Sequence, residues 1–243
     1  MRALFKSLLK SAGLELVRHD PTKVRIDVAE TPHAKRAEIL KKAGITLVYD
    51  VGAHKGWYSA DLRTFGYEGK IVSYEPQASP FKELEARSAD DPKWEVVKAA
   101  MGDKEGTTTI HVSEAPESSS LLDILPTHTD ALPESKVIGS EEVPIQTLDN
   151  VFGKHATQDD KVFLKLDVQG FEKNVLAGAK ESLSKIQGIQ MEMSLKPLYD
   201  GEALFSELHE ELYRLGFKMV WMEPGFKNEQ TGEMLQVDGI FLR

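Results

Sequence analysis

The sequence predicts an α/β fold with a mostly parallel sheet and one reversed strand near its end. Short apolar runs that resemble buried strands alternate with segments of helical spacing from residue 46 to residue 215. Two further strand-like runs, 218–223 and 235–242, then follow one another around a turn region that contains Gly and Asn, as in a terminal hairpin. The length of 243 residues suits one such domain with a large core. We therefore expect a domain at 45–243, preceded by an N-terminal helical extension and linker at 1–44.

Composition and charge exclude several classes of function. The absence of cysteine excludes disulfides, cysteine-ligated zinc and thiol catalysis, and it fits a reducing cytoplasm. A formal net charge of -9 argues against nucleic acid as a partner, because contact with phosphates needs clustered Lys and Arg. No run approaches the roughly 18 apolar residues of a membrane span, and the N-terminus lacks a signal-peptide pattern. We expect a cytoplasmic protein that acts on a small molecule or a glycan.

The extension begins with residues 2–18, which place apolar residues at helical spacing and basic residues off that face. This short basic amphipathic helix has two candidate roles: weak peripheral contact with an anionic membrane surface, or packing on its own domain or on a second copy in a homodimer. Packing is favoured, because Gly13 limits the helix and the apolar face is small. Residues 21–32 then suggest a linker or an edge strand, and residues 34–43 a helix that stops at Gly44.

The later elements follow from apolar periodicity and from breaking residues. Strands are predicted at 46–51, 70–76, 94–101, 107–112, 143–148, 161–167 and 186–193. Helices are predicted at 57–65, 79–89, 171–179 and 205–215. The excursion at 115–142 is rich in Ser, Thr, Pro and acidic residues, and segments of this length in a compact domain are commonly lids or binding loops. We expect it to close over a substrate and to carry Ser119 and Ser120 toward a cofactor.

The first strand leads into a glycine loop with the pattern Asp50-x-Gly52-Ala53-x-x-Gly56. Glycine allows the tight turn and the close approach of the backbone to a ligand. A nicotinamide fingerprint has Gly-x-Gly-x-x-Gly and holds a pyrophosphate, which Asp50 would repel. S-adenosyl-L-methionine instead carries an ammonium, a sulfonium and ribose hydroxyls, and no phosphate. We interpret the loop as its binding site, against the alternative of a tight turn without a ligand.

Acids at later strand ends extend this interpretation. Glu75 follows Asp50 at close to the ~20-residue offset at which a carboxylate accepts ribose hydroxyls, and Pro76 fixes an extended exit from its strand. Asp103 follows the next strand and either reaches the adenine or only shapes a turn. Asp167 ends the strand at 161–167 and is expected to contact the methionine end of the cofactor.

With these residues in hand, the chain resembles the FkbM family of S-adenosylmethionine-dependent methyltransferases over roughly residues 47–243. The resemblance rests on ordered motifs: Tyr49-Asp50-Val51-Gly52-Ala53, Tyr74-Glu75-Pro76, Ala100-Met101-Gly102-Asp103, Ser119-Ser120-Leu121, Thr147-Leu148-Asp149, Lys165-Leu166-Asp167-Val168-Gln169-Gly170-Phe171-Glu172 and Asp238-Gly239-Ile240-Phe241. It implies a seven-stranded, Rossmann-like class I methyltransferase fold and methyl transfer to an oxygen, commonly a hydroxyl of a sugar or a polyketide. One departure is Gln169, where the family usually has Glu, and an amide cannot serve as a base near neutral pH.

The predicted site follows from both lines of reasoning. Its cofactor-binding residues are Asp50, Gly52, Ala53, His54, Gly56, Glu75, Pro76, Asp103, Ser119, Ser120 and Asp167. Deprotonation of a hydroxyl calls for a general base, and the candidates are His54, Asp167, Glu192 and Asp238. A divalent metal held by Asp167, Glu192 and a third oxygen ligand is an alternative, since hard cations take such sets. We predict no metal site, because the sequence has no dense acidic cluster.

The predicted function is S-adenosylmethionine-dependent O-methylation of a hydroxyl on a sugar, a glycan or a secondary metabolite. The alternative is a non-catalytic cofactor-binding or interaction protein on the same fold. That alternative is disfavoured, because the glycine loop and the ribose acid are both intact.

Overall fold

The computed structural model describes residues 31–243, and one compact unit spans Pro32–Arg243. The predicted helix at 2–18 and most of the predicted linker lie outside the described residues. The unit begins with α2 (Pro32–Ala43), whose Ala37 and Leu40 are buried against the rest of the core. It therefore includes a helix that the sequence analysis had assigned to the extension.

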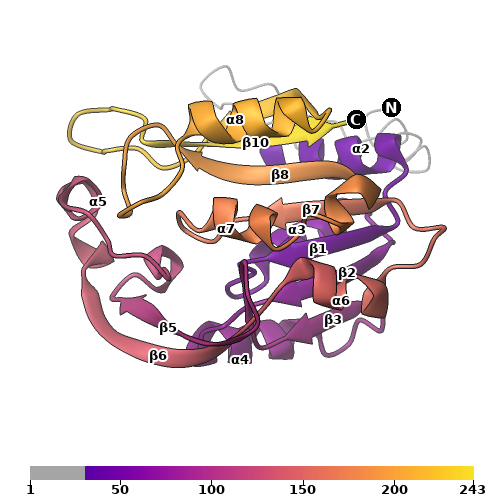
Figure 1. Ribbon diagram of the computed structural model, residues 1–243, viewed down its shortest axis with the longest axis horizontal. Helices are drawn as coiled ribbons and strands as arrows, with labels where there is room; N and C mark the ends of the chain where they lie inside the picture. The colour runs from indigo at the N-terminus through magenta and orange to yellow at the C-terminus, as the bar shows by residue number, and fades with distance from the viewer. Residues whose placement is uncertain (1–30) are drawn as a thin grey trace, which may run out of the picture. The chain divides into compact units, whose positions relative to one another are not determined.

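A seven-stranded sheet forms the centre of this unit (Figure 1). Its spatial order is β3 (Trp94–Val97), β2 (Lys70–Tyr74), β1 (Leu47–Val51), β7 (Val162–Leu166), β8 (Ile186–Ser194), β10 (Gln236–Leu242) and β9 (Lys218–Pro224). The strands from β3 to β8 pair in parallel, and β10 pairs antiparallel with both β8 and β9. This confirms the predicted mostly parallel sheet with a reversed C-terminal strand. The order changes direction between β1 and β7, which opens a crevice at their carboxyl ends.

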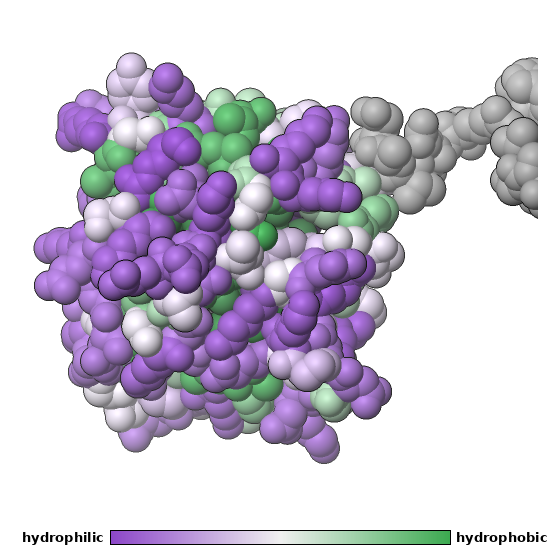
Figure 2. Space-filling view, turned by 90° about the vertical axis from the view of Figure 1, so that its right-hand side faces the viewer, coloured by the Kyte–Doolittle hydropathy of each residue, from purple (hydrophilic) through white to green (hydrophobic). Residues whose placement is uncertain are grey.

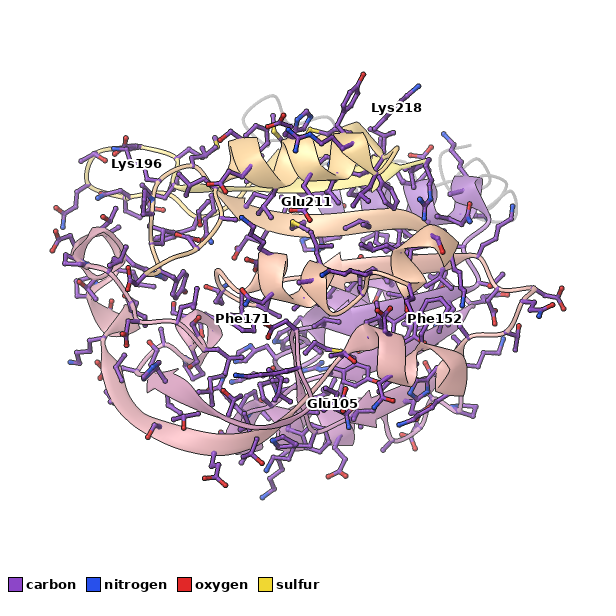
Figure 3. The ribbon with its side chains drawn as sticks, viewed as in Figure 1. Glu105, Phe152, Phe171, Lys196, Glu211 and Lys218 are labelled. Atoms are coloured by element: carbon purple, nitrogen blue, oxygen red, sulfur yellow. The ribbon has the colours of Figure 1, made fainter. Side chains whose placement is uncertain are left out.

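Helices cover both faces of this sheet, as the alternation along β1 illustrates. Val48 packs in a cluster with α2, α3 (Trp57–Thr64) and α4 (Ala78–Ser88). Tyr49 points to the opposite face, in a cluster with α6 (Leu148–His155), α7 (Glu172–Ala177) and α8 (Phe205–Arg214). There Phe152 of α6 (Figure 3) stacks on Tyr49, with ring centroids 5.7 Å apart. The short helix η4 (Ser182–Lys185) leads into β8.

A second sheet has three strands in the order β4 (Ala100–Met101), β6 (Val137–Gln146) and β5 (Gly106–Ser113). The sequence predicted one strand at 94–101, and this was wrong. The chain leaves the main sheet after Val97, where Ala99 N donates to Val97 O, and β4 then pairs in parallel with β6. β6 is also longer than the predicted strand at 143–148 and ends before the helix α6 begins at Leu148.

The excursion at 115–142 is folded. It contains η2 (Pro116–Ser118), α5 (Pro126–Ala131), η3 (Pro133–Ser135) and the start of β6, and each of the three short helices begins with Pro, which suits a first helical position. Leu125 N donates to Leu198 O at 2.9 Å, and Asp200 N donates to Asp123 O at 2.8 Å. Figure 1 shows α5 beside the loops that follow β8 and β9.

The surface is mainly hydrophilic on the face in Figure 2, as a content of 28% charged residues leads one to expect. The hydrophobic residues on this face of Figure 2 form small separate groups. Within residues 31–243, no helix combines the length and the apolar character that crossing a membrane requires.

Candidate active site

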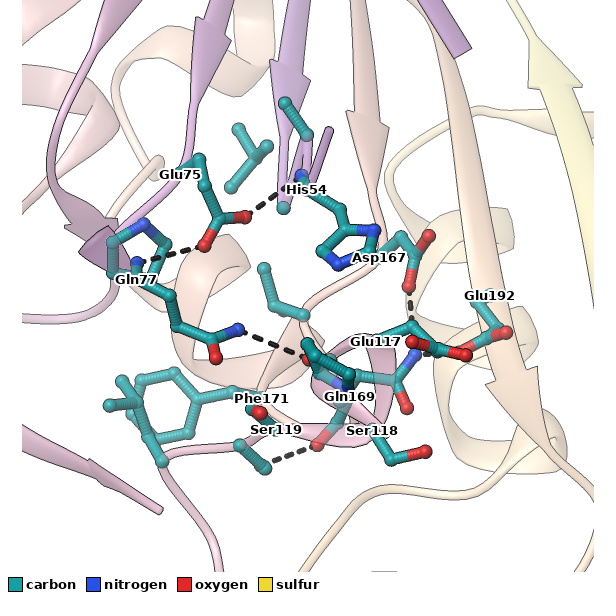
Figure 4. Close-up of a pocket in the computed structure, with 18 of the residues that line it drawn as sticks. His54, Glu75, Gln77, Glu117, Ser118, Ser119, Asp167, Gln169, Phe171 and Glu192 are labelled. Carbon is teal, nitrogen blue, oxygen red and sulfur yellow. Dashed lines mark hydrogen bonds between the residues drawn. The ribbon is translucent and has the colours of Figure 1, made fainter. Parts of the chain in front are cut away.

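A cavity of about 660 Å³ lies at the carboxyl ends of the central strands (Figure 4), within the usual size of small-molecule sites. Its walls come from the loop after β1, the end of β2, the excursion, the segment after β7, and the loop after β9. Nine of the predicted site residues line it: Gly52, Ala53, His54, Glu75, Pro76, Ser119, Ser120, Asp167 and Glu192. Asp50, Gly56, Asp103 and Asp238 are not among its lining residues.

The glycine loop turns tightly after β1. Gly52 has φ +76°, and a Cβ there would lie 1.8 Å from the carbonyl oxygen of Asp167. The amides of Gly52 and Ala53 both donate to Tyr74 O at 3.0 Å. Gly56, with φ +80°, precedes α3, and a Cβ there would meet Leu84 at 2.7 Å. Gly52 therefore brings the backbone to the cavity, whereas Gly56 shapes the turn behind it.

Glu75 is the buried acid at the end of β2. Its Oε2 accepts from His54 N and its Oε1 accepts from Gln77 N, both at 2.8 Å (Figure 4). Burial raises the pKa of Glu75 to about 7, although the hydrogen bonds from the two backbone amides lower it. A carboxylate oxygen can accept more than one hydrogen bond, so both oxygens remain able to accept from the two hydroxyls of a ribose.

Asp50 does not occupy the position that the sequence analysis gave it. The side chain is completely buried on the face of β1 that α3 covers. Its Oδ2 accepts from Ser59 Oγ at 2.7 Å and from Ser73 Oγ at 3.1 Å, and its Oδ1 lies 3.2 Å from Lys165 Nζ. The alternation of β1 directs this carboxylate under the helix, away from the crevice. The prediction that Asp50 contacts the ammonium of the cofactor directly was therefore wrong.

Asp50 belongs to a row of buried polar side chains that crosses four neighbouring strands in register: Ser73, Asp50, Lys165 and Gln190. Lys165 Nζ donates to Gly52 O at 2.8 Å and lies 3.4 Å from Asp167 Oδ2. Burial alone would lower the pKa of Lys165, but Asp167 and Asp50 together raise it. The lysine therefore stays charged and ties the glycine loop to Asp167.

Asp167 and Glu192 are bridged by the side chain of Gln169. Gln169 Nε2 donates to Asp167 Oδ1 at 2.9 Å and to Glu192 Oε2 at 2.7 Å (Figure 4), while its Oε1 accepts from Tyr199 OH. Gln236 Nε2 also donates to Glu192 Oε2, at 2.9 Å. Both bonds to Glu192 use Oε2, so Oε1 is the oxygen left for a substrate.

The pKa of Glu192 is raised well above its usual range, first by burial and then by the charges of Asp167 and Asp238. Asp238 lies opposite Glu192 in the β8–β10 pair, and its Oδ1 accepts from Gln190 Nε2 at 3.2 Å. Burial raises the pKa of Asp238 to about 6. Asp238 therefore acts on Glu192 through its charge, from outside the cavity.

His54 reaches the cavity from a strained position in the glycine loop. Its φ is +47°, which is uncommon for a residue with a Cβ. The hydrogen bond from its backbone N–H to Glu75 Oε2 holds it in this conformation. The Nε2 atom is buried and has no hydrogen-bond partner within residues 31–243. Burial lowers the pKa of His54, so the imidazole is neutral at pH 7. Figure 4 shows the ring between Glu75 and Asp167.

The serines of the excursion line the cavity, but their hydroxyls are already bonded within the protein. Ser119 Oγ accepts from Ser113 N at 3.0 Å, and Ser120 Oγ donates to Gln169 O at 2.6 Å. Both residues therefore fix the excursion against the site. Asp103 is exposed and lies outside the cavity lining.

Several residues that line the cavity were not predicted: Gln77, His128, Lys165 and Gln236. Of these, only Lys165 could have been noticed in the sequence, because it is a charged residue inside an otherwise apolar strand. Within residues 31–243, no three His, Asp or Glu side chains converge in a way that could hold a metal ion.

A glycine loop at a strand switch point, a ribose-type acid and an acidic crevice define a Rossmann-like protein that binds a cationic nucleoside cofactor. Residues 50–219, most of the chain, match the sequence model described as Methyltransferase FkbM domain. The chain therefore belongs to the FkbM methyltransferase family. It is an S-adenosyl-L-methionine-dependent methyltransferase with the class I fold, as the sequence analysis predicted.

Solved structures give further comparisons. The chain is 13% identical to precorrin-6y C5,15-methyltransferase from Geobacter metallireducens, covering 92% of this chain and 95% of that one, with a TM-score of 0.45. It is 11% identical to magnesium protoporphyrin IX methyltransferase from Synechocystis, solved with bound S-adenosylmethionine, covering 99% and 96%, with a TM-score of 0.48. No curated protein matches the chain.

Proposed function

We propose that this enzyme transfers a methyl group to a hydroxyl oxygen of a sugar, a glycan or a secondary metabolite, with Glu192 as the general base. The observation that supports this proposal is the state of the Glu192 carboxylate. It lines the cavity, it is fixed by two amide donors on Oε2, and its Oε1 has no hydrogen-bond partner among residues 31–243. A raised pKa brings a carboxylate closer to the range in which it can take a proton from an alcohol.

The cofactor fits the remainder of the cavity. The backbone of Gly52 and Ala53 and the exit at Pro76 shape its binding surface, Glu75 accepts from the ribose hydroxyls, and Asp167 offers a partly exposed carboxylate to the ammonium. When bound, S-adenosyl-L-methionine supplies a methyl group on a positively charged sulfur. A positive charge bound in the same cavity as Glu192 would lower the pKa of this acid and favour its ionised form.

The protein then has two tasks. It holds the acceptor oxygen in line for attack, and positioning of this kind supplies ~7 to 11 kcal/mol of the barrier. Glu192 Oε1 takes the hydroxyl proton as the oxygen–methyl bond forms and the sulfur–methyl bond breaks. The proton passes to solvent when the products leave.

The other predicted bases have different roles in this proposal. His54 is the second candidate, because its neutral ring has a free Nε2 in the cavity. Asp167 is held by Lys165 and Gln169, which suits cofactor binding. Asp238 has no direct access to the cavity.

The test is methyl transfer from isotopically labelled cofactor to a panel of sugars, cell-envelope glycan precursors and hydroxylated secondary metabolites. We expect a methyl ether that survives alkali. An alkali-labile ester or an N-methyl product would contradict transfer to a hydroxyl.

Substitutions then test the base. Glu192→Gln should lower kcat by ~10²- to 10⁴-fold while affinity for S-adenosylhomocysteine is retained. Asp238→Asn is the matched control, a half-buried acid beside the site, and should have a much smaller effect. If His54→Gln gives the large loss and Glu192→Gln does not, the base is His54.

A further inference from the structure

One wall of the cavity differs in chemistry from the cofactor end. It is formed by α5, by the residue after it and by the loop after β9, and its members are His128, Ala131, Leu132 and Phe226. We call these four residues the α5 wall. Apart from His128, all of them are apolar. They adjoin a small buried cluster that includes Leu198, Tyr199 and Leu235, so the wall is the inner surface of a hydrophobic core.

His128 is the one polar residue of this wall, and one of its nitrogens has no partner in the part of the chain that the structure describes. The ring is only 2% exposed, lies edge-on to Tyr199 and packs on Phe226, with both pairs of centroids 5.2 Å apart. Its Nε2 lies 3.5 Å from Ser118 Oγ, whereas Nδ1 is buried and forms no hydrogen bond with the described residues. A buried polar atom without a partner costs stability, which a ligand that supplies the missing bond would recover.

Most of the neighbouring polar groups are already used, and the exception is Glu117, an exposed acid of the cavity lining beside Ser118. Ser119 and Ser120 bond within the excursion and to Gln169, and Tyr199 OH lies within bonding distance of Ser118 O and Gln169 Oε1. Lys227 and Glu229 form an ion pair with each other at 3.4 Å, with both side chains exposed. At the α5 wall itself, His128 is therefore the residue whose side chain still offers a hydrogen bond.

We infer that the α5 wall binds a flat, largely apolar ring of the methyl acceptor and that His128 Nδ1 hydrogen-bonds to a single hydroxyl on that ring. This inference rests on the proposed transfer to a hydroxyl and narrows its acceptor class. A ring with hydroxyls all round would leave most of them without partners against Leu132 and Phe226, at a cost for each. A ring with one hydroxyl satisfies the wall and the imidazole together.

The charge state of the imidazole agrees with this assignment. Burial lowers the pKa of His128 to about 4, so the ring is neutral at pH 7. A neutral imidazole has one donor and one acceptor nitrogen. Since Nε2 is directed to Ser118, one bond of either polarity remains for a hydroxyl, which can donate or accept.

Binding of small probes tests the inference without any turnover. The probes are phenol, toluene and methyl β-D-glucopyranoside, added to the full chain saturated with S-adenosylhomocysteine. Nitrogen-15 spectra of the histidine rings report the partner of His128 Nδ1. We expect phenol to shift this signal saturably and to bind about fivefold to tenfold more tightly than toluene, the factor typical of one hydrogen bond. The glucoside should leave the signal unchanged.

Three variants separate the contributions of the wall. His128→Phe keeps the packing of the ring and should abolish the preference for phenol over toluene, whereas His128→Asn, which retains a polar atom near Nδ1, should keep part of it. Leu132→Asp should weaken both aromatic probes. Leu195→Asp is its matched control at an exposed leucine outside the cavity lining and should weaken neither.

The outcomes are distinct. Binding of the glucoside at His128 as tight as that of phenol, or a phenol preference that survives in His128→Phe, would overturn the inference. So would phenol binding that leaves the His128 signal unmoved in the wild type. A failed search for methyl transfer to any hydroxyl would count against the proposed function alone, because these probes are not required to react.

Discussion

Gln169 Nε2 lies 2.7 Å from Glu192 Oε2 and 2.9 Å from Asp167 Oδ1, so one neutral amide separates two carboxylates. The backbone of Gln169 is left-handed, with φ +54°. Ser120, which lies in the excursion, donates a hydrogen bond to the Gln169 carbonyl oxygen. These two backbone features direct the Gln169 side chain toward Asp167 and Glu192. At this position an amide contributes a donor to each acid, where a third carboxylate would repel both.

Gln169→Glu should accordingly shift the pH–rate profile. A glutamate beside Asp167 and Glu192 adds a like charge, which raises the pKa of the base further. Because the base must be ionised, the rising limb of kcat should move to higher pH by about one unit or more, and kcat at pH 7 should fall. The measurement is kcat from pH 6 to pH 9.5.

Gln187→Glu provides the control for that shift. Gln187 also lies in the region of β8, at the end of the strand far from the cavity, and is half-buried. Its variant should keep the wild-type profile. An unshifted profile in Gln169→Glu would show that the amide does not tune the base.

Affinity for S-adenosylhomocysteine should fall as the pH falls through 7. The pKa of Glu75 is raised from its usual value to about 7, and the ribose hydroxyls prefer the ionised acid as an acceptor. Protonation below pH 7 therefore competes with binding, and affinity should drop by about tenfold for each unit below the pKa. Calorimetry between pH 8 and pH 5.5 gives this slope.

Glu75→Gln should bind more weakly at pH 8 and lose the slope, whereas the exposed Glu85→Gln should behave like the wild type. The same shift has an opposite sign for folding. A raised pKa favours the folded state below the usual value, so this contribution to stability is lost as the pH rises through 7.

Gly52→Ala should abolish cofactor binding. Its Cβ would lie 1.8 Å from the carbonyl of Asp167, and its φ of +76° strains any side chain, so the loop must move. Gly201→Ala is a close control, since Gly201 has φ +75° and open space around the position of a Cβ. The two variants share the backbone strain, and retained binding in Gly52→Ala would show that the loop can yield.

Asp50→Asn should act on stability more than on cofactor affinity. It leaves the buried Lys165 with one acid partner, and removal of a buried partner costs roughly 3 kcal/mol. Urea unfolding measures this loss, and Glu210→Gln, from an exposed pair with Arg214, should change little. Asp167→Asn should show the reverse balance, with weaker binding and a smaller loss of stability. A larger loss of affinity in Asp50→Asn than in Asp167→Asn would instead support direct contact between Asp50 and the cofactor ammonium.

The strand ends were predictable because their chemistry is local. An apolar run that stops at Gly52, Glu75 or Asp167 shows both the strand and the side chain that follows it, and parallel strands bring these ends together. The face of the sheet on which Asp50 lies was not predictable in this way. In a strand that is buried on both faces, the sequence has no alternation to show where a polar residue points.

The acceptor side was less accessible to sequence reasoning. His128 and Gln236 meet the cavity only because the excursion bonds to the segment at 198–200 and the loop after β9 folds back. Such contacts join residues far apart in the chain and carry no periodic pattern. The composition of 115–142 indicated a binding segment, but not its short helices or its firm attachment to the protein.

The antiparallel pairing of β5 with β6 brings Ser113 opposite Val137, so the chain leaves and re-enters the three-stranded sheet at neighbouring points. Everything between these two residues, including α5, leaves and returns at one place on the three-stranded sheet. Inside it, Ser120 Oγ donates to Gln169 O and Leu125 N donates to Leu198 O, so the segment also supports the bridge between Asp167 and Glu192. A replacement segment joined at residues 113 and 137 would therefore have to keep the serine at position 120 in order to keep Gln169 in place.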